Sequence, residues 1–288
     1  MFGRVMTAMV TPFKGDDVNY KEAARYARFL AENGSDSLLV CGSTGENPTM
    51  TKEEKLRLID TVRNAVDIPV MAGTGTFNTR ESLEFTKEVD KLGVDAFLVV
   101  TPYYNKPNQE GIYEHFKAVA GGTEKPVMLY NIPGRSVREI SVDTIIRLSA
   151  ISNIRYLKAA CGNLDNVSLT RAGTPEDFII YSGDDSLTLP MLAVGGRGVV
   201  SVASSIIGKE INKMIAAYEA GDVKKAMALH HDNYDAFRDL FCDTNPVPVK
   251  YALSRMGFDT EEVRLPMVPL KDQHKQLIDG MLKRHGLI

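Results

Sequence analysis

A lysine in an otherwise apolar segment is the residue of this sequence best suited to chemistry. Lys158 follows Tyr156 and Leu157 and precedes two alanines, a pattern typical of a β-strand that is buried on both faces. Burial weakens the hold of a lysine on its proton, and the neutral amine is a nucleophile. The alternative is a lysine at a strand end whose amine reaches water along its aliphatic stem. The residues that follow the other strands decide between the two interpretations.

Polar residues and glycines gather directly after the other predicted strands. They are Thr7 and Thr11, 42–46 (Gly-Ser-Thr-Gly-Glu), 73–75 (Gly-Thr-Gly), 101–105 (Thr-Pro-Tyr-Tyr-Asn), Tyr130 with Asn131 and Arg135, 182–185 (Ser-Gly-Asp-Asp), and Ser201. Each group alone also fits a turn or core packing, but all of them together favour a site around the lysine. A lysine among hydroxyls suits Schiff-base chemistry with a 2-oxo acid, because the iminium is an electron sink. Backbone N–H groups of 42–46 could bind the carboxylate.

The elements that must position these residues alternate regularly along the chain. Strands are expected at 5–10, 37–41, 69–72, 96–100, 126–130, 154–160, 178–181 and 198–203, and helices at 20–33, 51–66, 79–92, 109–120, 142–148, 164–171, 186–194 and 211–219. Thr51 and Glu54 have the spacing of a capping box. Eight strand–helix units of this size predict an α/β fold, a (β/α)8 TIM barrel with a C-terminal helical appendage. A doubly wound open sheet is the alternative.

The alternation of strands and helices stops after Gly221. Helices are expected at 223–239, 247–256 and 271–285, with no strand between them. We therefore predict a catalytic barrel over residues 1–221 and a C-terminal helical region over residues 222–288.

The composition argues against several classes of protein. The chain has 44% hydrophobic and 25% charged residues, and its net charge of −3 gives no electrostatic footprint for nucleic acid or an anionic membrane. We expect no membrane span and no signal peptide. Cys41, Cys161 and Cys242 lie far apart without metal-ligand spacing, and the five histidines fall in predicted helices. We expect no metal and a cytoplasmic location.

The chain resembles the pyruvate-dependent class I aldolases of the dihydrodipicolinate synthase / N-acetylneuraminate lyase superfamily. The motifs that carry the resemblance are 42–46, 101–105, 130–135 (Tyr-Asn-Ile-Pro-Gly-Arg), Lys158, 182–185 and 245–250 (Asn-Pro-Val-Pro-Val-Lys). Within the superfamily these motifs are most similar to the dihydrodipicolinate synthase family. The resemblance implies condensation of pyruvate with L-aspartate-4-semialdehyde in lysine and diaminopimelate biosynthesis, through a lysine Schiff base and without a separate cofactor.

The resemblance also implies the catalytic residues. Lys158 would form the Schiff base, and Tyr130 would donate and accept protons beside it. Thr44 would relay protons between Tyr130 and Tyr104, the latter supplied by a neighbouring subunit. The form usual in the family is a homotetramer, a dimer of tight dimers.

The substrate-binding residues follow from the same resemblance. Ser43 and Thr44 would bind the pyruvate carboxylate, and Arg135 would bind the carboxylate of the semialdehyde. The carbonyl of Gly183 and the side chain of Val200 would line the pocket.

Three positions depart from the usual pattern of the family and leave other acceptors open. Ala159 stands where glutamate is common, Ser43 replaces threonine, and Ser136-Val137 replaces Thr-Gly. A lyase similar to N-acetylneuraminate lyase or a 2-keto-3-deoxy-sugar-acid aldolase is therefore an alternative, although Arg135 favours an aldehyde with a carboxylate. A non-catalytic binding protein on the same scaffold is a further alternative.

The positions that match the inhibitory lysine site of some relatives are altered. Those relatives have two histidines and an asparagine where this chain has Lys52, Lys55 and Phe77, while Glu81 and Tyr103 remain. Two ammonium groups would repel a cationic ligand, and a phenyl ring cannot replace the hydrogen bonds of an amide. The alternative is that both lysines point into solvent, which also removes the histidine partners. We predict that free lysine does not inhibit this protein.

Overall fold

Eight strands form a closed barrel in the computed structural model, which describes residues 2–288. In barrel order they are β1 (Val5–Ala8), β10 (Gly198–Ser201), β9 (Ile179–Ser182), β8 (Ile154–Ala159), β7 (Val127–Asn131), β6 (Ala96–Val100), β5 (Val70–Gly73) and β4 (Ser37–Val40). Neighbouring strands pair in parallel, as β7 and β8 do where Leu129 lies opposite Leu157. The predicted (β/α)8 barrel is confirmed, and the open sheet is wrong.

The described chain divides into two compact units. One takes the chain up to Pro69 together with Ser201–Ile288, and the other is Val70–Val200. The division predicted from sequence, 1–221 and 222–288, follows the change of element pattern and stays a prediction.

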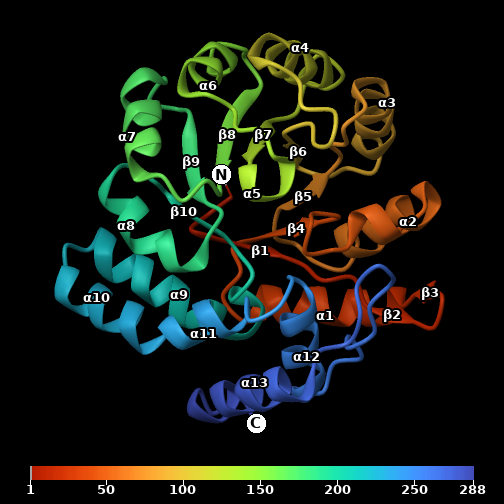
Figure 1. Cartoon of the computed structure of the whole chain (residues 1–288), viewed down its shortest axis with the longest axis vertical. Coiled ribbons are helices and arrows are strands. Elements are labelled where there is room, and N and C mark those ends of the chain that lie inside the picture. The colour runs from red at the N-terminus through yellow and green to blue at the C-terminus, as the bar shows by residue number, and fades with distance from the viewer. Residues whose placement is uncertain (1) are drawn as a thin grey trace. The chain divides into compact units, whose positions relative to one another are not determined.

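The unit Val70–Val200 consists of strands with helices packed on their outer side (Figure 1). Its helices are α3 (Thr79–Asp90), α4 (Gln109–Ala120), α5 (Pro133–Ser136), α6 (Val142–Ser149), α7 (Leu164–Gly173) and α8 (Thr188–Ala193). Asparagine or serine side chains cap the longer ones, for example Asn78 on α3 and Ser141 on α6. Such caps satisfy the free N–H groups of a first helical turn and fix where each helix begins.

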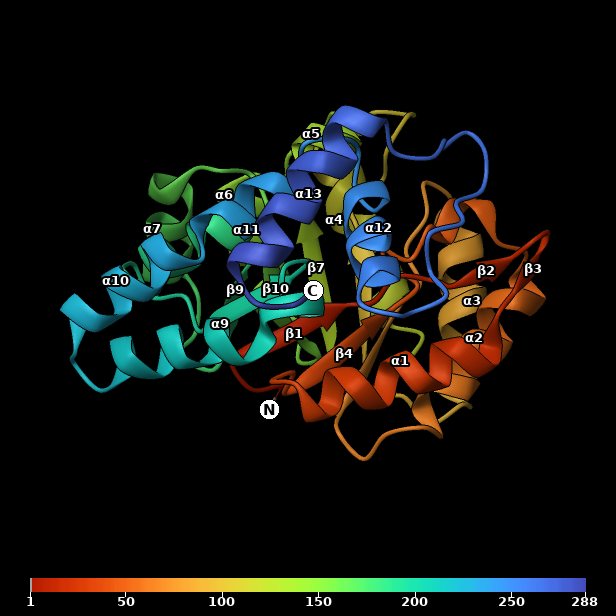
Figure 2. The same ribbon diagram turned by 90° about the horizontal axis from the view of Figure 1, so that it is seen from below.

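The other unit carries the remaining α-helices (Figure 2). They are α1 (Tyr20–Glu32), α2 (Lys52–Arg63), α9 (Ser204–Glu219), α10 (Val223–Asp232), α11 (Tyr234–Asp239), α12 (Val247–Arg255) and α13 (Asp272–Arg284). The predicted capping box is confirmed, because the side chains of Thr51 and Glu54 each accept a hydrogen bond from the other's backbone N–H. Helices α12 and α13 pack side by side.

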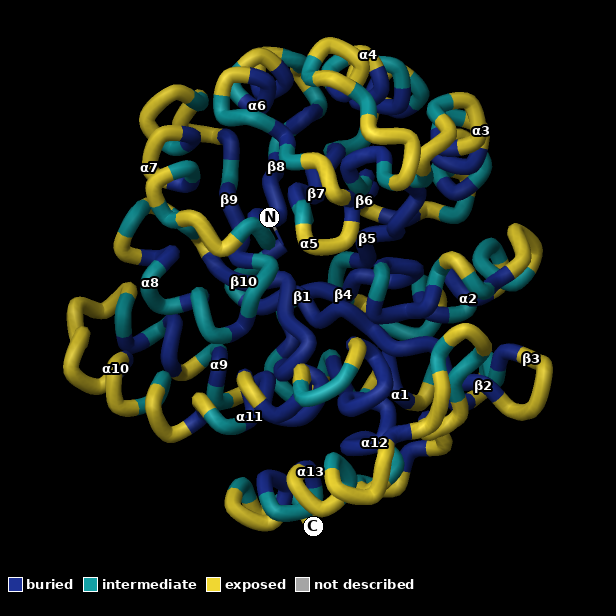
Figure 3. Tube along the Cα trace, viewed as in Figure 1, coloured by how far each residue is buried: buried dark blue, intermediate teal, exposed yellow. Residues whose placement is uncertain are grey.

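Burial follows the elements within each unit (Figure 3). The barrel strands are buried along nearly their whole length, whereas the helices alternate between buried and exposed positions. Strands buried on both faces explain why the sequence shows continuous apolar runs rather than a period of two. In the described residues, no helix is long and apolar enough to cross a membrane.

Four features of the elements differ from the sequence prediction. Helix α9 begins at Ser204 rather than Ile211, with a kink at Ile207 where the backbone is not helical. The helix expected at 223–239 is two helices that meet at Asn233. The short antiparallel pair β2 (Phe13–Lys14) and β3 (Asp17–Val18) and the single-turn helix α5 were not predicted.

Candidate active site

Lys158 and Tyr130 are paired directly across neighbouring strands. They lie opposite each other in the register of β7 and β8, so their side chains leave the sheet on the same face. Each residue is only 5% exposed, and Nζ of Lys158 lies 4.3 Å from the centroid of the Tyr130 ring. The structure therefore places a buried amine against a phenol, the pair that the sequence predicted for Schiff-base chemistry.

A carboxylate that the sequence analysis did not single out accompanies this pair. Burial raises the pKa of the Asp184 carboxyl, and the positive charge of Lys158 opposes that rise. The loop that carries Asp184 is fixed to the strands: the N–H of Gly183 donates to the carbonyl of Ala159 over 2.7 Å. A Cβ atom at Gly183 would lie 2.5 Å from Cβ of Ala160, so only glycine allows this approach. The charge of Lys158 therefore acts on the Asp184 carboxyl against the effect of burial.

The turn 42–46 presents Ser43 and Thr44 directly after β4. Two non-glycine residues lie in the left-handed region: Cys41, directly before the turn, with φ 57°, and Glu46, its last residue, with φ 52°. The N–H groups of Gly45 and Glu46 donate to carbonyls within the turn, so these two amides are engaged inside the turn itself. The use of this turn as an anion site stays a prediction.

The left-handed residues make this turn costly, because such conformations cost about 1–3 kcal/mol each. Buried bonds offset that cost. The hydroxyl of Thr11 donates to the carbonyl of Gly45 over 2.6 Å, and Nδ2 of Asn245 donates to Oγ1 of Thr44 over 2.9 Å. The sequence analysis placed Thr11 among the site hydroxyls, but in the structure its hydroxyl stabilises the turn through this hydrogen bond.

An ion pair without solvent contact holds the last residue of the turn. Nζ of Lys250 lies 2.6 Å from Oε1 of Glu46, with side chains that are 0% and 2% exposed. The backbone N–H of Arg264 donates to the other carboxylate oxygen over 3.1 Å. Burial lowers the pKa of Lys250, and the charge of Glu46 opposes that shift. The sequence motif 245–250 was recognised, but it carried no signal that its ends bind the turn 42–46.

The other predicted site residues lie in different environments. Arg135 is exposed on the single-turn helix α5, whose Ser136 hydroxyl donates to the carbonyl of Arg138 over 2.7 Å. Tyr104 is 86% exposed and has a φ of 68°. Val200 is buried in β10. Within the two units the structure thus brings together Lys158 with Tyr130, and Ser43 with Thr44, but leaves Tyr104 facing solvent.

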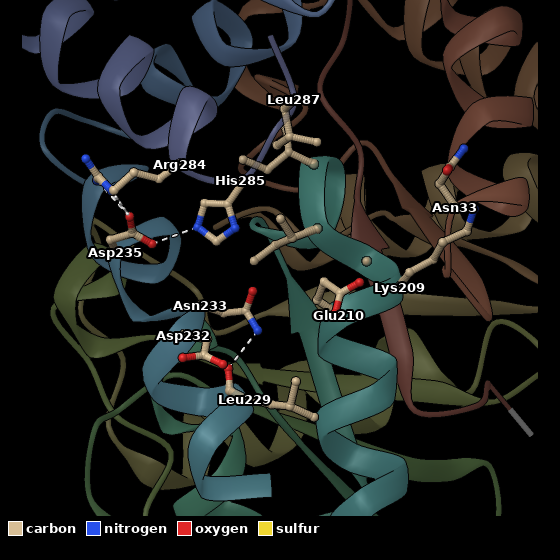
Figure 4. Close-up of a pocket in the computed structure, with 13 residues that line it drawn as sticks. Asn33, Lys209, Glu210, Leu229, Asp232, Asn233, Asp235, Arg284, His285 and Leu287 are labelled. Atoms are coloured by element: carbon tan, nitrogen blue, oxygen red, sulfur yellow. Dashed lines mark hydrogen bonds and ion pairs between the residues drawn. The ribbon is translucent and has the colours of Figure 1, made fainter. Parts of the chain in front are cut away.

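One cavity of about 540 Å³ lies apart from these residues, between α9, α10, α11 and the end of the chain (Figure 4). None of the predicted site residues lines it. Three of its charged groups pair with one another: Asp235 accepts from Nε of Arg284 over 2.7 Å and lies 2.8 Å from Nε2 of His285. Among the described residues, no cluster of three His, Cys, Asp or Glu side chains could hold a metal ion.

Comparison with known proteins agrees with the motifs over the whole chain. A protein of Listeria welshimeri named 4-hydroxy-tetrahydrodipicolinate synthase is 50% identical over 286 residues, 98% of each chain. The crystal structure of a dihydrodipicolinate synthase from Bacillus anthracis matches with a TM-score of 0.96 at 47% identity, covering 98% of both chains. The enzyme from Cyanidioschyzon merolae, solved with lysine bound, matches with a TM-score of 0.98 at 45% identity, covering 100% of this chain and 99% of that one.

These similarities confirm the resemblance drawn from the motifs. The sequence model of the dihydrodipicolinate synthetase family matches residues 1–285. With the closed barrel and a buried lysine paired with a tyrosine, the chain belongs to the dihydrodipicolinate synthetase family.

Proposed function

We propose that this protein condenses pyruvate with L-aspartate-4-semialdehyde to give 4-hydroxy-tetrahydrodipicolinate, with Lys158 as the Schiff-base residue. The observation that carries the proposal is the buried Lys158 amine against the ring of Tyr130. Relatives that are about half identical to this chain bear the name of that synthase. No separate cofactor is needed, because the imine formed between pyruvate and lysine is itself the electron sink.

The reaction proceeds through two carbon centres of pyruvate. The Lys158 amine attacks C2, and the carbonyl oxygen leaves as water to give an iminium. Loss of a proton from C3 gives an enamine, whose C3 attacks the aldehyde carbon of the semialdehyde while the aldehyde oxygen gains a proton. The amino group of the semialdehyde then attacks C2, which releases the lysine and closes the ring.

The proton transfers are assigned to hydroxyl groups. Tyr130 donates a proton to the C2 oxygen that leaves as water and accepts the proton that C3 loses, and Thr44 relays protons between Tyr130 and the Tyr104 side chain of a neighbouring subunit. A phenol has a reference pKa near 10, so a relay of hydroxyls assists it at neutral pH. The exposure of Tyr104 in the single chain supports a role in another subunit.

The substrates are bound at two places by their carboxylates. Ser43 and Thr44 bind the carboxylate of pyruvate, Arg135 binds that of the semialdehyde, and the Gly183 carbonyl and Val200 line the pocket. We assign the protein to the cytoplasm as a homotetramer, a dimer of dimers. Its three cysteines are free thiols, as a reducing compartment requires.

An acceptor assay tests the proposal. Pyruvate consumption is measured with aspartate semialdehyde, with N-acetylmannosamine and with glyceraldehyde. We expect turnover with the semialdehyde only. Faster turnover with a neutral, hydroxylated aldehyde would assign the protein to the lyase or sugar-acid aldolase branch, and no turnover with any aldehyde would favour a binding protein.

The role of Arg135 in binding the semialdehyde is tested with the variant Arg135→Ala and a matched control. A charged hydrogen bond to a carboxylate contributes about 1.5–3 kcal/mol, so Arg135→Ala should raise the KM for the semialdehyde at least about tenfold. The KM for pyruvate should change little. Arg138→Ala is the control, because Arg138 is also exposed and its Nε donates to the Lys106 carbonyl over 3.4 Å. Equal effects of Arg135→Ala on both substrates would contradict this assignment.

A further inference from the structure

The segment that carries Arg135 is a loop closed at its base by one buried side chain. The amide of Asn131 accepts from the N–H of Ile140 over 3.0 Å and donates to the carbonyl of the same residue over 3.3 Å. Both partners are backbone groups with fixed roles, so the orientation of the amide follows from them. Asn131 and Ile140 are both buried. Residues 131–140 therefore form a compact loop whose two ends are joined.

The base of this loop is also tied to the strand that carries Lys158. Asn131 is the last residue of β7, and its backbone carbonyl accepts from the N–H of Ala160, two residues after Lys158, over 2.9 Å. The residue before it in β7, Tyr130, lies opposite Lys158. Helix α5, which carries Arg135, follows at the carboxyl end of β7 within the same compact unit (Figure 2). The loop and the reacting lysine thus share one rigid base.

A second buried side chain holds the loop across its middle. Ser136 is buried, and its hydroxyl lies 2.9 Å from the carbonyl oxygen of Ile132 and 2.7 Å from that of Arg138. A hydroxyl has one hydrogen, which these two carbonyls share. The side chain of Ser136 thereby joins the two ends of the single helical turn on which Arg135 stands.

The backbone directly after Ser136 has a conformation that needs such support. Val137 has a φ of 62°, in the left-handed region, where a β-branched residue is an outlier. Its side chain is 62% exposed, so packing within the chain offsets little of this strain. Its N–H donates to the carbonyl of Pro133 over 2.9 Å. Strained residues of this kind persist where the surrounding structure over-determines them, and they cluster at sites that bind ligands.

A further amide holds the outer side of the loop. Nε2 of Gln109 donates to the carbonyl of Glu139 over 2.9 Å, and Oε1 of Gln109 accepts from the N–H of Ser141 over 3.0 Å. Backbone partners again determine the orientation of the amide. Gln109 is the first residue of α4, so this contact ties the loop to a long helix of the same unit.

We infer that Asn131, Ser136 and Gln109 are positioning residues, which hold Arg135 in place for the carboxylate of the acceptor. A loop that is ordered before binding loses less entropy when it binds its ligand, which raises the affinity. A binding side chain also needs a supporting shell that fixes its geometry. The inference rests on the proposed function, in which Arg135 binds the semialdehyde. The three positioning residues touch no reacting atom in that scheme.

Ser136→Ala tests the inference, because it removes only the hydroxyl that joins the two ends of the helical turn. We expect the KM for the semialdehyde to rise about three- to tenfold, because a loosely held Arg135 loses part of its charged hydrogen bond. The KM for pyruvate and the borohydride trapping of pyruvate should stay as in the wild type. Ser136→Thr keeps the hydroxyl and should stay within about twofold of the wild-type KM for the semialdehyde.

A double-mutant cycle with Arg135→Ala separates positioning from general destabilisation. If Ser136 acts through Arg135, Ser136→Ala should raise the KM for the semialdehyde no further in the Arg135→Ala background. Ser149→Ala is the matched control: Ser149 is also buried, in α6 of the same unit, and its hydroxyl donates to the carbonyl of Ile146 over 2.8 Å. This control should lower the Tm without changing the KM for either substrate.

The possible outcomes are distinct. A wild-type KM for the semialdehyde in Ser136→Ala, equal rises for both substrates, or additive effects in the cycle would overturn the inference, while condensation by the wild type still supports the proposed function. Failure of the wild type to condense pyruvate with the semialdehyde would refute the proposed function and the inference with it. If Ser136→Ala does not fold, the cycle is run with Gln109→Ala, and an unchanged or additive KM there overturns the inference.

Discussion

Replacing Lys250 by methionine should destabilise the protein far more than replacing any exposed lysine. Methionine keeps most of the aliphatic stem, which packs where Nζ now lies 4.4 Å from the centroid of the Phe13 ring. What disappears is the ammonium that lies 2.6 Å from Oε1 of Glu46. The carboxylate then stays buried with the N–H of Arg264 as its remaining donor, at 3.1 Å.

The expected loss follows from the burial of both partners. Removing one member of a buried pair costs about 3–5 kcal/mol of unfolding free energy, because an uncompensated charge remains. For a chain of this size that corresponds to a fall in Tm of roughly 10 °C. The double variant Glu46→Leu with Lys250→Met removes both charges and should recover most of the loss. Its free energy of unfolding should stay about 1 kcal/mol below that of the wild type, since the N–H of Arg264 loses its acceptor.

Thermal and urea unfolding of the single and double variants measure these differences. Lys213→Met is the control, because its pair with Glu210 is almost as short, 2.7 Å, but has side chains 62% and 38% exposed. Such a pair contributes about 0–1 kcal/mol. The reasoning would be refuted if the double variant lost as much free energy of unfolding as Lys250→Met alone, or more. So would equal losses for Lys250→Met and Lys213→Met.

Three further predictions concern acid stability, the subunit interface and regulation. Burial lowers the pKa of His115 to about 4, below its ordinary 6.5, so the unfolded chain binds the proton first and stability is lost as the pH falls through this window. The free energy of unfolding should fall by about 3 kcal/mol across this window. When urea unfolding is measured at pH 7 and at pH 4.5, the variant His115→Gln should lose correspondingly less of this free energy than the wild type. Mixing inactive Tyr104→Phe and Lys158→Ala subunits should restore activity in hybrid dimers, and verified hybrids without activity would count against a shared site. Free lysine titrated at fixed pyruvate and semialdehyde should not inhibit, because the Phe77 ring packs edge-to-face on Tyr103 at 5.3 Å and offers no hydrogen bond; saturable inhibition at submillimolar lysine would contradict this.

The sequence predicted the barrel because its strands are buried on both faces and its helices begin at capping residues. All eight strands were found within a few residues of their positions. The start of α9 was missed because small residues and a kink at Ile207 interrupt the helical period. Gly208 is needed there, since a Cβ atom would lie 2.6 Å from the carbonyl of Asn33, a contact between distant parts of the sequence.

Some residues of the candidate site were predicted from the sequence and others were not, again because contacts between distant parts of the sequence leave no local pattern. Lys158 and Tyr130 were found because a lysine in an apolar strand is anomalous, and their pairing follows from the register of adjacent strands. The roles of Asn245 and Lys250 depend on contacts across about 200 residues of sequence, which no local pattern encodes. Asp184 was named only within the motif 182–185, because the charge of Lys158 reaches its carboxyl only in the folded chain.

Borohydride trapping with pyruvate tests the assignment of Lys158 most directly. The protein is incubated with pyruvate, reduced, weighed intact and then digested to locate the modified lysine. We predict one reduced pyruvate adduct per chain, on Lys158, and none in Lys158→Ala. An adduct on another lysine, such as the still more deeply buried Lys250, or undiminished trapping in Lys158→Ala, would contradict the proposed mechanism.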